Sequence, residues 1–291
     1  MINDKTHLKR RFLVVKKLVK TLSISALALS TASSLLTAQA EEEYVLRVAS
    51  HLPPMTDIVE LAAKNIAEPY SIELVEVSDN IQYNEAVFHD EAYASFAQHQ
   101  PFMAMFNEER DADLEAIQPI YNAVVGFYSP VYQSIEDIED GAEVAIPSDP
   151  TNEARALLIL AQQGLITLEE KDALPTVDDI KENPKNLQFT SVDLLNLTGA
   201  YEDGVELVFN YPTYIAKIDL TPEDALFLED EEDNTFAITL VVRKENVDNE
   251  ATKALKDAFT SPEVYEYLEK LAEAGHLRPA FELESDETTA E

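Results

Sequence analysis

The stretch Ala145–Leu157, with the sequence AIPSDPTNEARAL, decides how this chain is expected to fold. A short β-prone run at 143–147 leads into Asp149 and Pro150. This pair is a strong helix start, because aspartate favours the N-cap position and proline the first helical position. The helix is predicted to end at Gly164. A strand, a tight turn and a helix in this order predict one unit of an α/β fold.

Arg155 lies in the second turn of this predicted helix, close to the free backbone N–H groups of its N-terminus. A guanidinium at the carboxyl end of a strand, beside a helix N-terminus, is well placed to bind a carboxylate. The residues alone leave a second interpretation open, in which Arg155 pairs with one of the many acidic residues of the chain.

The N-terminus has the pattern of an export signal. Basic residues within 5–20 precede an apolar run rich in serine and alanine at 22–36, and Ala38-Gln39-Ala40 is a small-x-small cleavage site. We therefore predict a signal peptide over 1–40 and a mature protein that is soluble in the periplasm, with an uncleaved anchor as the alternative. The sequence contains no cysteine, so neither a lipid anchor on an N-terminal cysteine nor a disulfide is expected.

The chain is strongly acidic, with 21 Lys and Arg against 56 Asp and Glu. Residues 1–40 hold seven of the basic residues and one acid, which leaves 14 basic and 55 acidic residues in 41–291, a net charge of −41. Such a field repels nucleic acid and anionic lipid head groups, so neither is an expected partner. A solvated surface suited to high ionic strength is the favoured interpretation, with cation binding as the alternative.

Strand and helix patterns alternate along the mature region, which predicts an α/β fold with a mainly parallel sheet. The predicted strands are 44–49, 71–77, 92–96, 114–129, 143–147, 187–192, 205–210, 225–228 and 236–242. The predicted helices are 54–67, 81–89, 101–109, 150–163, 177–182, 251–259 and 262–274.

Four separated blocks give the chain a resemblance to the methionine-binding, NlpA-type family of substrate-binding proteins for ABC importers. The blocks are QHQP at 98–101, AIPSDPTNEARAL at 145–157, ENPKNL at 182–187 and DALFLED at 224–230. They occur in the family's order, and the resemblance extends from about Val45 to Leu271.

This resemblance implies a two-lobed periplasmic-binding-protein fold, α/β in each lobe, with a double crossover hinge. It implies lobe one at 43–125 and 225–282, lobe two at 126–224, and an acidic tail at 283–291 that composition predicts to be disordered. Such proteins hold a small solute in the cleft and close by hinge motion. In the family the solute is an amino acid, typically methionine, and no cofactor is expected.

The resemblance assigns Arg155 to the solute carboxylate and places His99 in the cleft. Asn152 belongs to the same block as Asp149 and is expected to shape its turn. The other residues predicted to bind the solute are Phe96, Phe102, Asn80, Asn210, Thr213 and Tyr214. Structural roles stay open for several of these: a hydrogen-bonded histidine, core phenylalanines, and a tyrosine that lines the hinge.

Three positions depart from the family pattern. Asn80 and Ala97 stand where the family has aromatic rings, and Thr213 stands where it has an amide. Aromatic rings enclose a thioether favourably, so these changes predict weakened methionine binding and a preference for a polar or bulkier side chain.

We therefore predict a periplasmic solute receptor, not an enzyme, whose partners are an amino-acid-like solute and the membrane subunits of an ABC importer. One rival is a metal receptor or metal enzyme built on His51, His89 and His99 with the acids Asp90 and Glu91, although no His-x-x-x-His spacing occurs. The other is an acidic scaffold that has lost solute binding. The sequence contains no Gly-x-Ser-x-Gly elbow, so a hydrolase is not expected.

Overall fold

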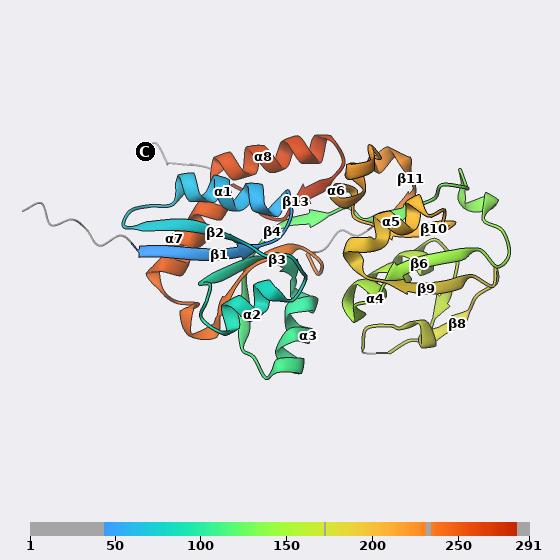
Figure 1. Cartoon of the computed structure of the whole chain (residues 1–291), viewed down its shortest axis with the longest axis horizontal. Coiled ribbons are helices and arrows are strands. Elements are labelled where there is room, and N and C mark those ends of the chain that lie inside the picture. The colour runs from blue at the N-terminus through green and yellow to red at the C-terminus, as the bar shows by residue number, and fades with distance from the viewer. Residues whose placement is uncertain (1–43, 172, 231–233, 284–291) are drawn as a thin grey trace, which may run out of the picture. The chain divides into compact units, whose positions relative to one another are not determined.

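The computed structural model describes residues 44–171, 173–230 and 234–283 (Figure 1). The signal peptide predicted for 1–40 and residues 284–291 of the predicted tail lie outside the described residues. The described part forms two α/β lobes, each built around its own sheet. The predicted two-lobed fold is confirmed.

Lobe one contains a six-stranded sheet in the order β13-β4-β12-β3-β1-β2. Its strands are β13 (Leu277–Pro279), β4 (Leu114–Ala123), β12 (Ile238–Arg243), β3 (Ala94–His99), β1 (Tyr44–Ser50) and β2 (Tyr70–Glu76). Its helices are α1 (Met55–Asn65), α2 (Gln82–Phe88), α3 (Gln100–Arg110), α7 (Glu250–Phe259) and α8 (Pro262–Glu273).

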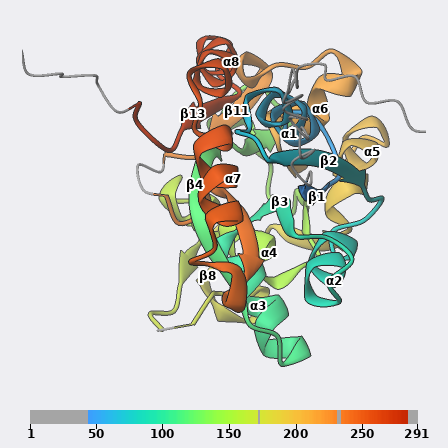
Figure 2. The same ribbon diagram turned by 90° about the vertical axis from the view of Figure 1, so that its left-hand side faces the viewer.

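Helices cover the lobe-one sheet on more than one side. Helix α1 contacts α7 and α8, whereas α2 and α3 contact β3 and β4 and lie away from α1 and α8 (Figure 2). Every residue of β3 is buried as a result, including the polar Ser95, Gln98 and His99, and the side chains of Gln98 and His99 form hydrogen bonds. Phe96 of this strand packs edge-to-face on Phe259 of α7, with 5.1 Å between the ring centroids.

Lobe two contains a five-stranded sheet in the order β11-β5-β10-β6-β9. Its strands are β11 (Ala225–Leu228), β5 (Gly126–Tyr128), β10 (Leu207–Asn210), β6 (Glu143–Pro147) and β9 (Gln188–Val192). The helices of this lobe are α4 (Pro150–Gln162), α5 (Leu197–Glu202) and α6 (Pro212–Ile215).

The chain crosses between the two sheets twice, once between β4 and β5 and once between β11 and β12. The prediction placed 225–228 in lobe one, but β11 pairs with β5 of lobe two, so the second crossover begins after β11. Gly126 allows this pairing, because a Cβ atom there would lie 2.6 Å from the carbonyl oxygen of Phe227.

Both sheets are mixed, although the alternation of elements predicted a mainly parallel sheet. Strands β1, β2 and β3 run parallel, as do β6, β9 and β10. The antiparallel pairs involve the strands next to the crossovers, such as β4 with β12 and β5 with β11. One crossover leaves lobe one and the other returns to it, so the strands that flank them run in opposite directions.

The helix predicted at 177–182 is wrong. The structure has a 3-10 turn at Val177–Asp179, followed by β8 (Ile180–Glu182), which pairs with β7 (Thr167–Leu168). The backbone N–H and the hydroxyl of Thr176 both donate to the carboxylate of Asp179, a local capping arrangement that closes a single turn. The strand predicted at 114–129 is divided into β4 and β5 by the first crossover.

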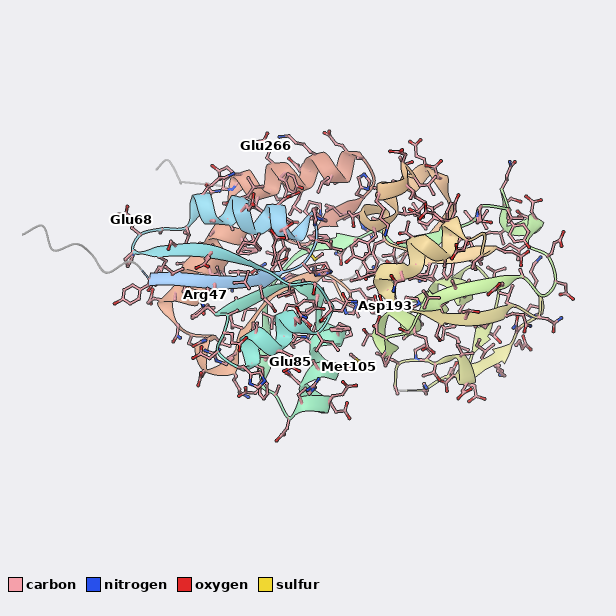
Figure 3. All side chains as sticks on the ribbon, viewed as in Figure 1. Arg47, Glu68, Glu85, Met105, Asp193 and Glu266 are labelled. Atoms are coloured by element: carbon pink, nitrogen blue, oxygen red, sulfur yellow. The ribbon has the colours of Figure 1, made fainter. Side chains whose placement is uncertain are left out.

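Acidic side chains lie on the surface of both lobes. Glu68 and Glu266 of lobe one and Asp193 of lobe two are exposed (Figure 3). Within the described ranges, no helix is long and apolar enough to cross a membrane.

Candidate functional site

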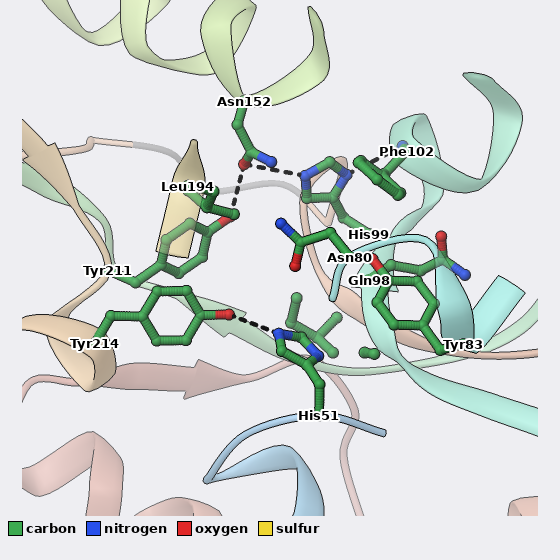
Figure 4. Close-up of a pocket in the computed structure, with 12 residues that line it drawn as sticks. His51, Asn80, Tyr83, Gln98, His99, Phe102, Asn152, Leu194, Tyr211 and Tyr214 are labelled. Carbon is green, nitrogen blue, oxygen red and sulfur yellow. Dashed lines mark hydrogen bonds between the residues drawn. The ribbon is translucent and has the colours of Figure 1, made fainter. Parts of the chain in front are cut away.

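A pocket lies where residues of both lobes face one another (Figure 4). Lobe one contributes the residue after β1, the end of β3, the segment before α2, α2 itself, the N-terminus of α3 and the first residue of β12. Lobe two contributes the segment after β9, the N-terminus of α4 and the segment around α6. The residues that line it are His51, Asn80, Tyr83, Ala97, Gln98, His99, Phe102, Asn152, Leu194, Tyr211, Tyr214 and Ile238.

The N-terminus of α4 positions Asn152. Asp149 is the N-cap, as predicted, and its carboxylate accepts the backbone N–H of Asn152 at 2.9 Å. The Nδ2 group of Asn152 donates to the same carboxylate at 3.0 Å. Its Oδ1 atom is thereby turned toward the pocket, where it accepts the hydroxyl of Tyr211 at 2.8 Å. The cap that starts the helix therefore also orients a pocket amide.

His99 ends β3 and caps α3. The backbone N–H of Phe102 donates to its Nδ1 atom at 3.2 Å, so Nε2 carries the ring proton in the neutral imidazole. That Nε2 atom lies 3.4 Å from Oδ1 of Asn152. Burial, and then the positive charge of Arg155, lower the pKa of His99 to about 3. His99 is therefore neutral at pH 7 and links the two lobes through a long hydrogen bond.

A second histidine lies lower in the pocket. The Nε2 atom of His51 is 3.1 Å from the hydroxyl of Tyr214, and its ring stacks on Tyr83 with 5.6 Å between the centroids. Burial lowers the pKa of His51 to about 4, so this side chain is also neutral at pH 7. Its Nδ1 atom is buried and has no hydrogen-bond partner among the described residues.

Gln98 is fixed by an amide pair within lobe one. Its Oε1 atom accepts Nδ2 of the fully buried Asn84 at 2.7 Å, and its Nε2 donates back to Oδ1 of Asn84. Two reciprocal hydrogen bonds satisfy most of the polar atoms of both amides, so the pair is stable away from solvent.

Arg155 lies behind the pocket and is not among its lining residues. Arg155 is 1% exposed, and its Nε donates to Oε1 of Glu229 at 2.7 Å while one terminal nitrogen donates to Oε2. It also donates to the carbonyl of Ala123 at 3.0 Å and to the hydroxyl of Tyr211 at 3.2 Å. This arrangement matches the second interpretation of the sequence, in which Arg155 pairs with an acidic residue of its own chain.

The pocket combines aromatic rings with uncharged polar groups. Tyr83, Phe102, Tyr211 and Tyr214 supply rings, and Leu194 and Ile238 add apolar surface. Burial raises the pKa of Tyr211 to about 12, so its phenol is protonated at pH 7. No side chain in the lining carries a charge at neutral pH, because both histidines are neutral. Such a surface suits an apolar side chain together with a few hydrogen bonds.

The family was found by comparison with known proteins. The model of the NlpA lipoprotein family matches residues 46–281. The chain belongs to this family. It is 34% identical over 226 residues to the D-methionine-binding lipoprotein MetQ of Escherichia coli (strain K12), a match that covers 76% of this chain and 83% of that relative.

Two solved structures show how far the similarity of this NlpA family member extends. A lipoprotein of the YaeC family from Enterococcus faecalis V583 is 50% identical, with a TM-score of 0.73, and the match covers 82% of this chain and 100% of that chain. A nutrient-binding protein from Burkholderia cenocepacia bound to methionine is 30% identical, with a TM-score of 0.76 and coverage of 81% and 100%. The predictions of a substrate-binding protein for an ABC importer, and not an enzyme, are confirmed by this membership.

The structure brings five of the predicted site residues of this NlpA protein into the pocket lining: His99, Phe102, Asn80, Asn152 and Tyr214. Arg155 is separated from the pocket by Tyr211, to whose hydroxyl it donates. Three others do not line the pocket. Phe96 is a core residue, Asn210 bonds to Thr198 and to the backbone N–H of Tyr211, and Thr213 lies beside Tyr214 in α6.

Sequence reasoning did not assign His51, Tyr83, Gln98, Leu194, Tyr211 or Ile238 to the solute site. Gln98 belongs to the QHQP block and could have been found there, next to His99. Tyr211 and Tyr83 follow no motif; the fold alone brings them to the pocket.

The rival metal site finds no support among these residues. Over the ranges that the structure describes, no group of three His, Asp or Glu side chains is arranged to hold a metal ion. His89 instead lies 3.2 Å from Glu85 on α2, outside the pocket lining.

Proposed function

We propose that this protein binds an amino acid with an apolar side chain, with methionine as the first candidate, and delivers it to the membrane subunits of an ABC importer. The observation that carries the proposal is the aromatic pocket between the lobes. Relatives at 34% and 30% identity are named for methionine binding or were solved with methionine bound.

The rings of the pocket support an apolar solute side chain. Tyr83 and Phe102 lie 6.3 Å apart, and Tyr211 and Tyr214 lie 5.2 Å apart, measured between ring centroids. These rings make up for the aromatic residues that are absent at Asn80 and Ala97. A thioether gains favourable contacts with ring edges, so this arrangement favours methionine more than the sequence alone suggested.

The polar end of the pocket supports the backbone of an amino acid. The Nε2–H group of His99 and the hydroxyl of Tyr211 both donate to Oδ1 of Asn152. In this proposal they donate to the solute carboxylate when the solute binds. Arg155 lies behind Tyr211 and donates to its hydroxyl at 3.2 Å. Because the guanidinium is paired with Glu229, in this proposal Arg155 acts on the solute carboxylate through Tyr211.

Solute entry requires the pocket to open. The cavity volume of the pocket is about 30 Å³, enough for one or two water molecules but not for an amino acid. The first crossover consists of residues 124–125 alone, and we propose that the lobes part about the two crossovers and close over the solute.

Isothermal titration with L-methionine, D-methionine, leucine, phenylalanine, serine and a short peptide tests the proposal. We expect the tightest binding among the apolar amino acids, with methionine first. Tighter binding of serine or of the peptide would instead favour the preference for a polar or bulkier side chain that Asn80, Ala97 and Thr213 predict. Absence of binding to every solute would favour the scaffold that has lost its function.

We further propose that the mature protein begins at Glu41 and works in the periplasm without a lipid. The cleavage pattern at 38–40 and the lack of a cysteine in the sequence support this, because lipidation of this type needs a cysteine thiol. Its relatives, by contrast, are named lipoproteins. N-terminal sequencing of periplasmic material should give Glu41, and recovery of 1–40 in the membrane fraction would show an uncleaved anchor.

A further inference from the structure

Two polar groups on the lobe-one side of the pocket have no hydrogen-bond partner in the part of the chain that the structure describes. His51 is 8% exposed, and its Nδ1 atom is buried and unpaired. The side-chain amide of the half-buried Asn80 also makes no hydrogen bond there, and it extends toward Tyr211 and Tyr214 of lobe two (Figure 4). Buried polar atoms in folded proteins are almost always paired, so an unpaired nitrogen in a pocket lining indicates a partner that the solute supplies.

His51 is suited to accept a hydrogen bond at this nitrogen. Burial lowers its pKa to about 4, so the ring is neutral at pH 7 and one of its two nitrogens has a free lone pair. The other nitrogen, Nε2, lies 3.1 Å from the hydroxyl of Tyr214. An incoming N–H donor selects the tautomer in which Nε2 donates to this hydroxyl and Nδ1 accepts from the solute.

The two pocket histidines differ in the charge that acts on them. Burial is the main reason why both pKa values are low, but the positive charge of Arg155 lowers the pKa of His99 further, whereas the negative charge of Asp79 raises that of His51. Oδ1 of Asp79 accepts the backbone N–H of Ile81 at 2.8 Å, which fixes this carboxylate next to the pocket wall. The His51 end of the pocket is therefore the end that favours a cation.

We propose that His51 and Asn80 form the subsite for the solute ammonium, in which Nδ1 of His51 and Oδ1 of Asn80 accept its N–H groups. The ammonium is then held by lobe one, while the solute carboxylate reaches His99 and Tyr211. Because Tyr211 belongs to lobe two, a bound amino acid connects the two lobes. This inference rests on the proposed function and names the residues that select an amino acid over the same acid without its amino group.

The experiment compares L-methionine with 4-(methylthio)butanoate, which has the same carboxylate and thioether but no ammonium, by isothermal titration. His51→Phe keeps a ring to stack on Tyr83 but removes both nitrogens, and Asn80→Leu keeps the size of the side chain but removes the acceptor. We expect each variant to bind methionine about tenfold more weakly, because a hydrogen bond to a charged group is lost. The affinity for 4-(methylthio)butanoate should change by less than about twofold.

Equal losses for the two ligands in both variants would show that His51 and Asn80 only shape the pocket, and the proposal would be overturned. His89→Phe is the matched control, because it makes the same exchange at a histidine that lies outside the pocket lining, 3.2 Å from Glu85. The ratio of the two dissociation constants should stay at the wild-type value in this control. An equal shift in His89→Phe would also contradict the proposal.

The wild type gives a further test that does not depend on the folding of a variant, which thermal unfolding checks. Methionine should bind about tenfold or more tightly than 4-(methylthio)butanoate. Equal affinities would show that the ammonium has no subsite, although the proposed function would stand. A wild type that binds no amino acid at all would instead overturn the proposed function, and the inference would fall with it.

Discussion

The lobe-one wall of the pocket is supported within its own lobe, whereas the lobe-two wall is tied to the hinge. Gln98 rests on Asn84, and Tyr83 packs near Phe102, all within lobe one. On the other side, Asn152 contacts Tyr211, Tyr211 contacts Arg155, and Arg155 is held by Glu229 in a crossover. His99 and His51 make the bonds that cross between the walls.

Mutations in the two walls should therefore act on different properties of the protein. A change on the lobe-one wall should alter mainly the shape of the pocket, because its partners move with the same lobe. A change on the lobe-two wall should affect stability and solute binding together, because the same hydrogen bonds hold the crossover. Four measurements test whether the two walls differ in this way.

Replacing Arg155 by alanine should have the largest effect. The change leaves the carboxylate of Glu229 buried without its charged partner, and breaking a buried pair in this way costs about 3–5 kcal/mol of unfolding free energy. Denaturant unfolding checks the loss, and titration with methionine should show that binding is lost as well. Lys270→Ala, which breaks an exposed pair with Glu266, should leave stability nearly unchanged, because solvent screens such a pair. Equal stability of the wild type and Arg155→Ala would contradict the idea that the lobe-two wall is tied to the hinge.

The two histidines that cross between the walls should make stability fall in mild acid. In the unfolded chain a histidine titrates near pH 6.5, whereas the folded pKa values are about 4 for His51 and about 3 for His99. Below pH 6.5 the unfolded state therefore binds more protons, and the unfolding free energy drops as the pH falls. Each histidine contributes up to about 1.4 kcal/mol per pH unit.

Urea unfolding between pH 7 and 4.5 measures this slope, in a range above the usual titration of most carboxylates. His276, whose pKa is also lowered by burial, adds in the same direction, so His99→Gln is needed to assign the effect. We expect a shallower slope in that variant. A slope identical to that of the wild type would mean that His99 is not held neutral.

Removing one hydroxyl from the lobe-two wall should have an intermediate effect. Tyr211→Phe keeps the ring but leaves Oδ1 of Asn152 and a guanidinium N–H without this partner. We expect a loss of about 1–3 kcal/mol in unfolding free energy, together with weaker methionine binding. Tyr44→Phe, at an exposed ring, is the control for the substitution. A variant that loses binding but keeps full stability would separate the wall from the hinge.

Trimming a ring on the lobe-one wall should have the smallest effect. Phe102→Leu retains an apolar side chain but removes aromatic contacts to the solute, so the affinity for methionine should fall by about 1 kcal/mol, or about fivefold. Titration calorimetry measures this loss, and serine affinity should stay nearly constant. A similar loss for serine would show that Phe102 supports the fold of the pocket and does not contact the side chain of the solute.

Much of the fold could be predicted from local sequence. One example is the helix start at Asp149 and Pro150, together with the helix that follows and the buried strand before it. These features depend on residues that are neighbours in the sequence, so the local sequence is enough to predict them. The helix predicted at 177–182 was wrong because the local capping interaction between Thr176 and Asp179 competes with a helix of only six residues. The mixed pairing of strands could not be predicted from alternation, because it depends on the direction in which each crossover runs.

The candidate site was predicted only in part. Motif blocks gave His99, Phe102 and Asn152, since the positions that shape a turn or cap lie close together in sequence. Tyr83 and Tyr211 were missed because they carry no motif and reach the pocket from α2 and the segment before α6. Phe96 was misplaced, because residues alternate in direction along β3 and its ring faces Phe259 in the core.

The amino-acid sequence was enough to predict the family, the alternation of strands and helices, the acidic surface and the chemical kinds of side chain available for binding. Which of these side chains meet depends on how the chain folds. An arginine near a helix N-terminus can bind a solute or an acid of its own chain, and local sequence contains nothing that chooses between them. The choice was made when the second crossover placed Glu229 within 2.7 Å of Arg155, 74 residues away along the chain. Burial away from water then makes that pairing hard to give up, because an unpartnered charge costs several kcal/mol in the interior.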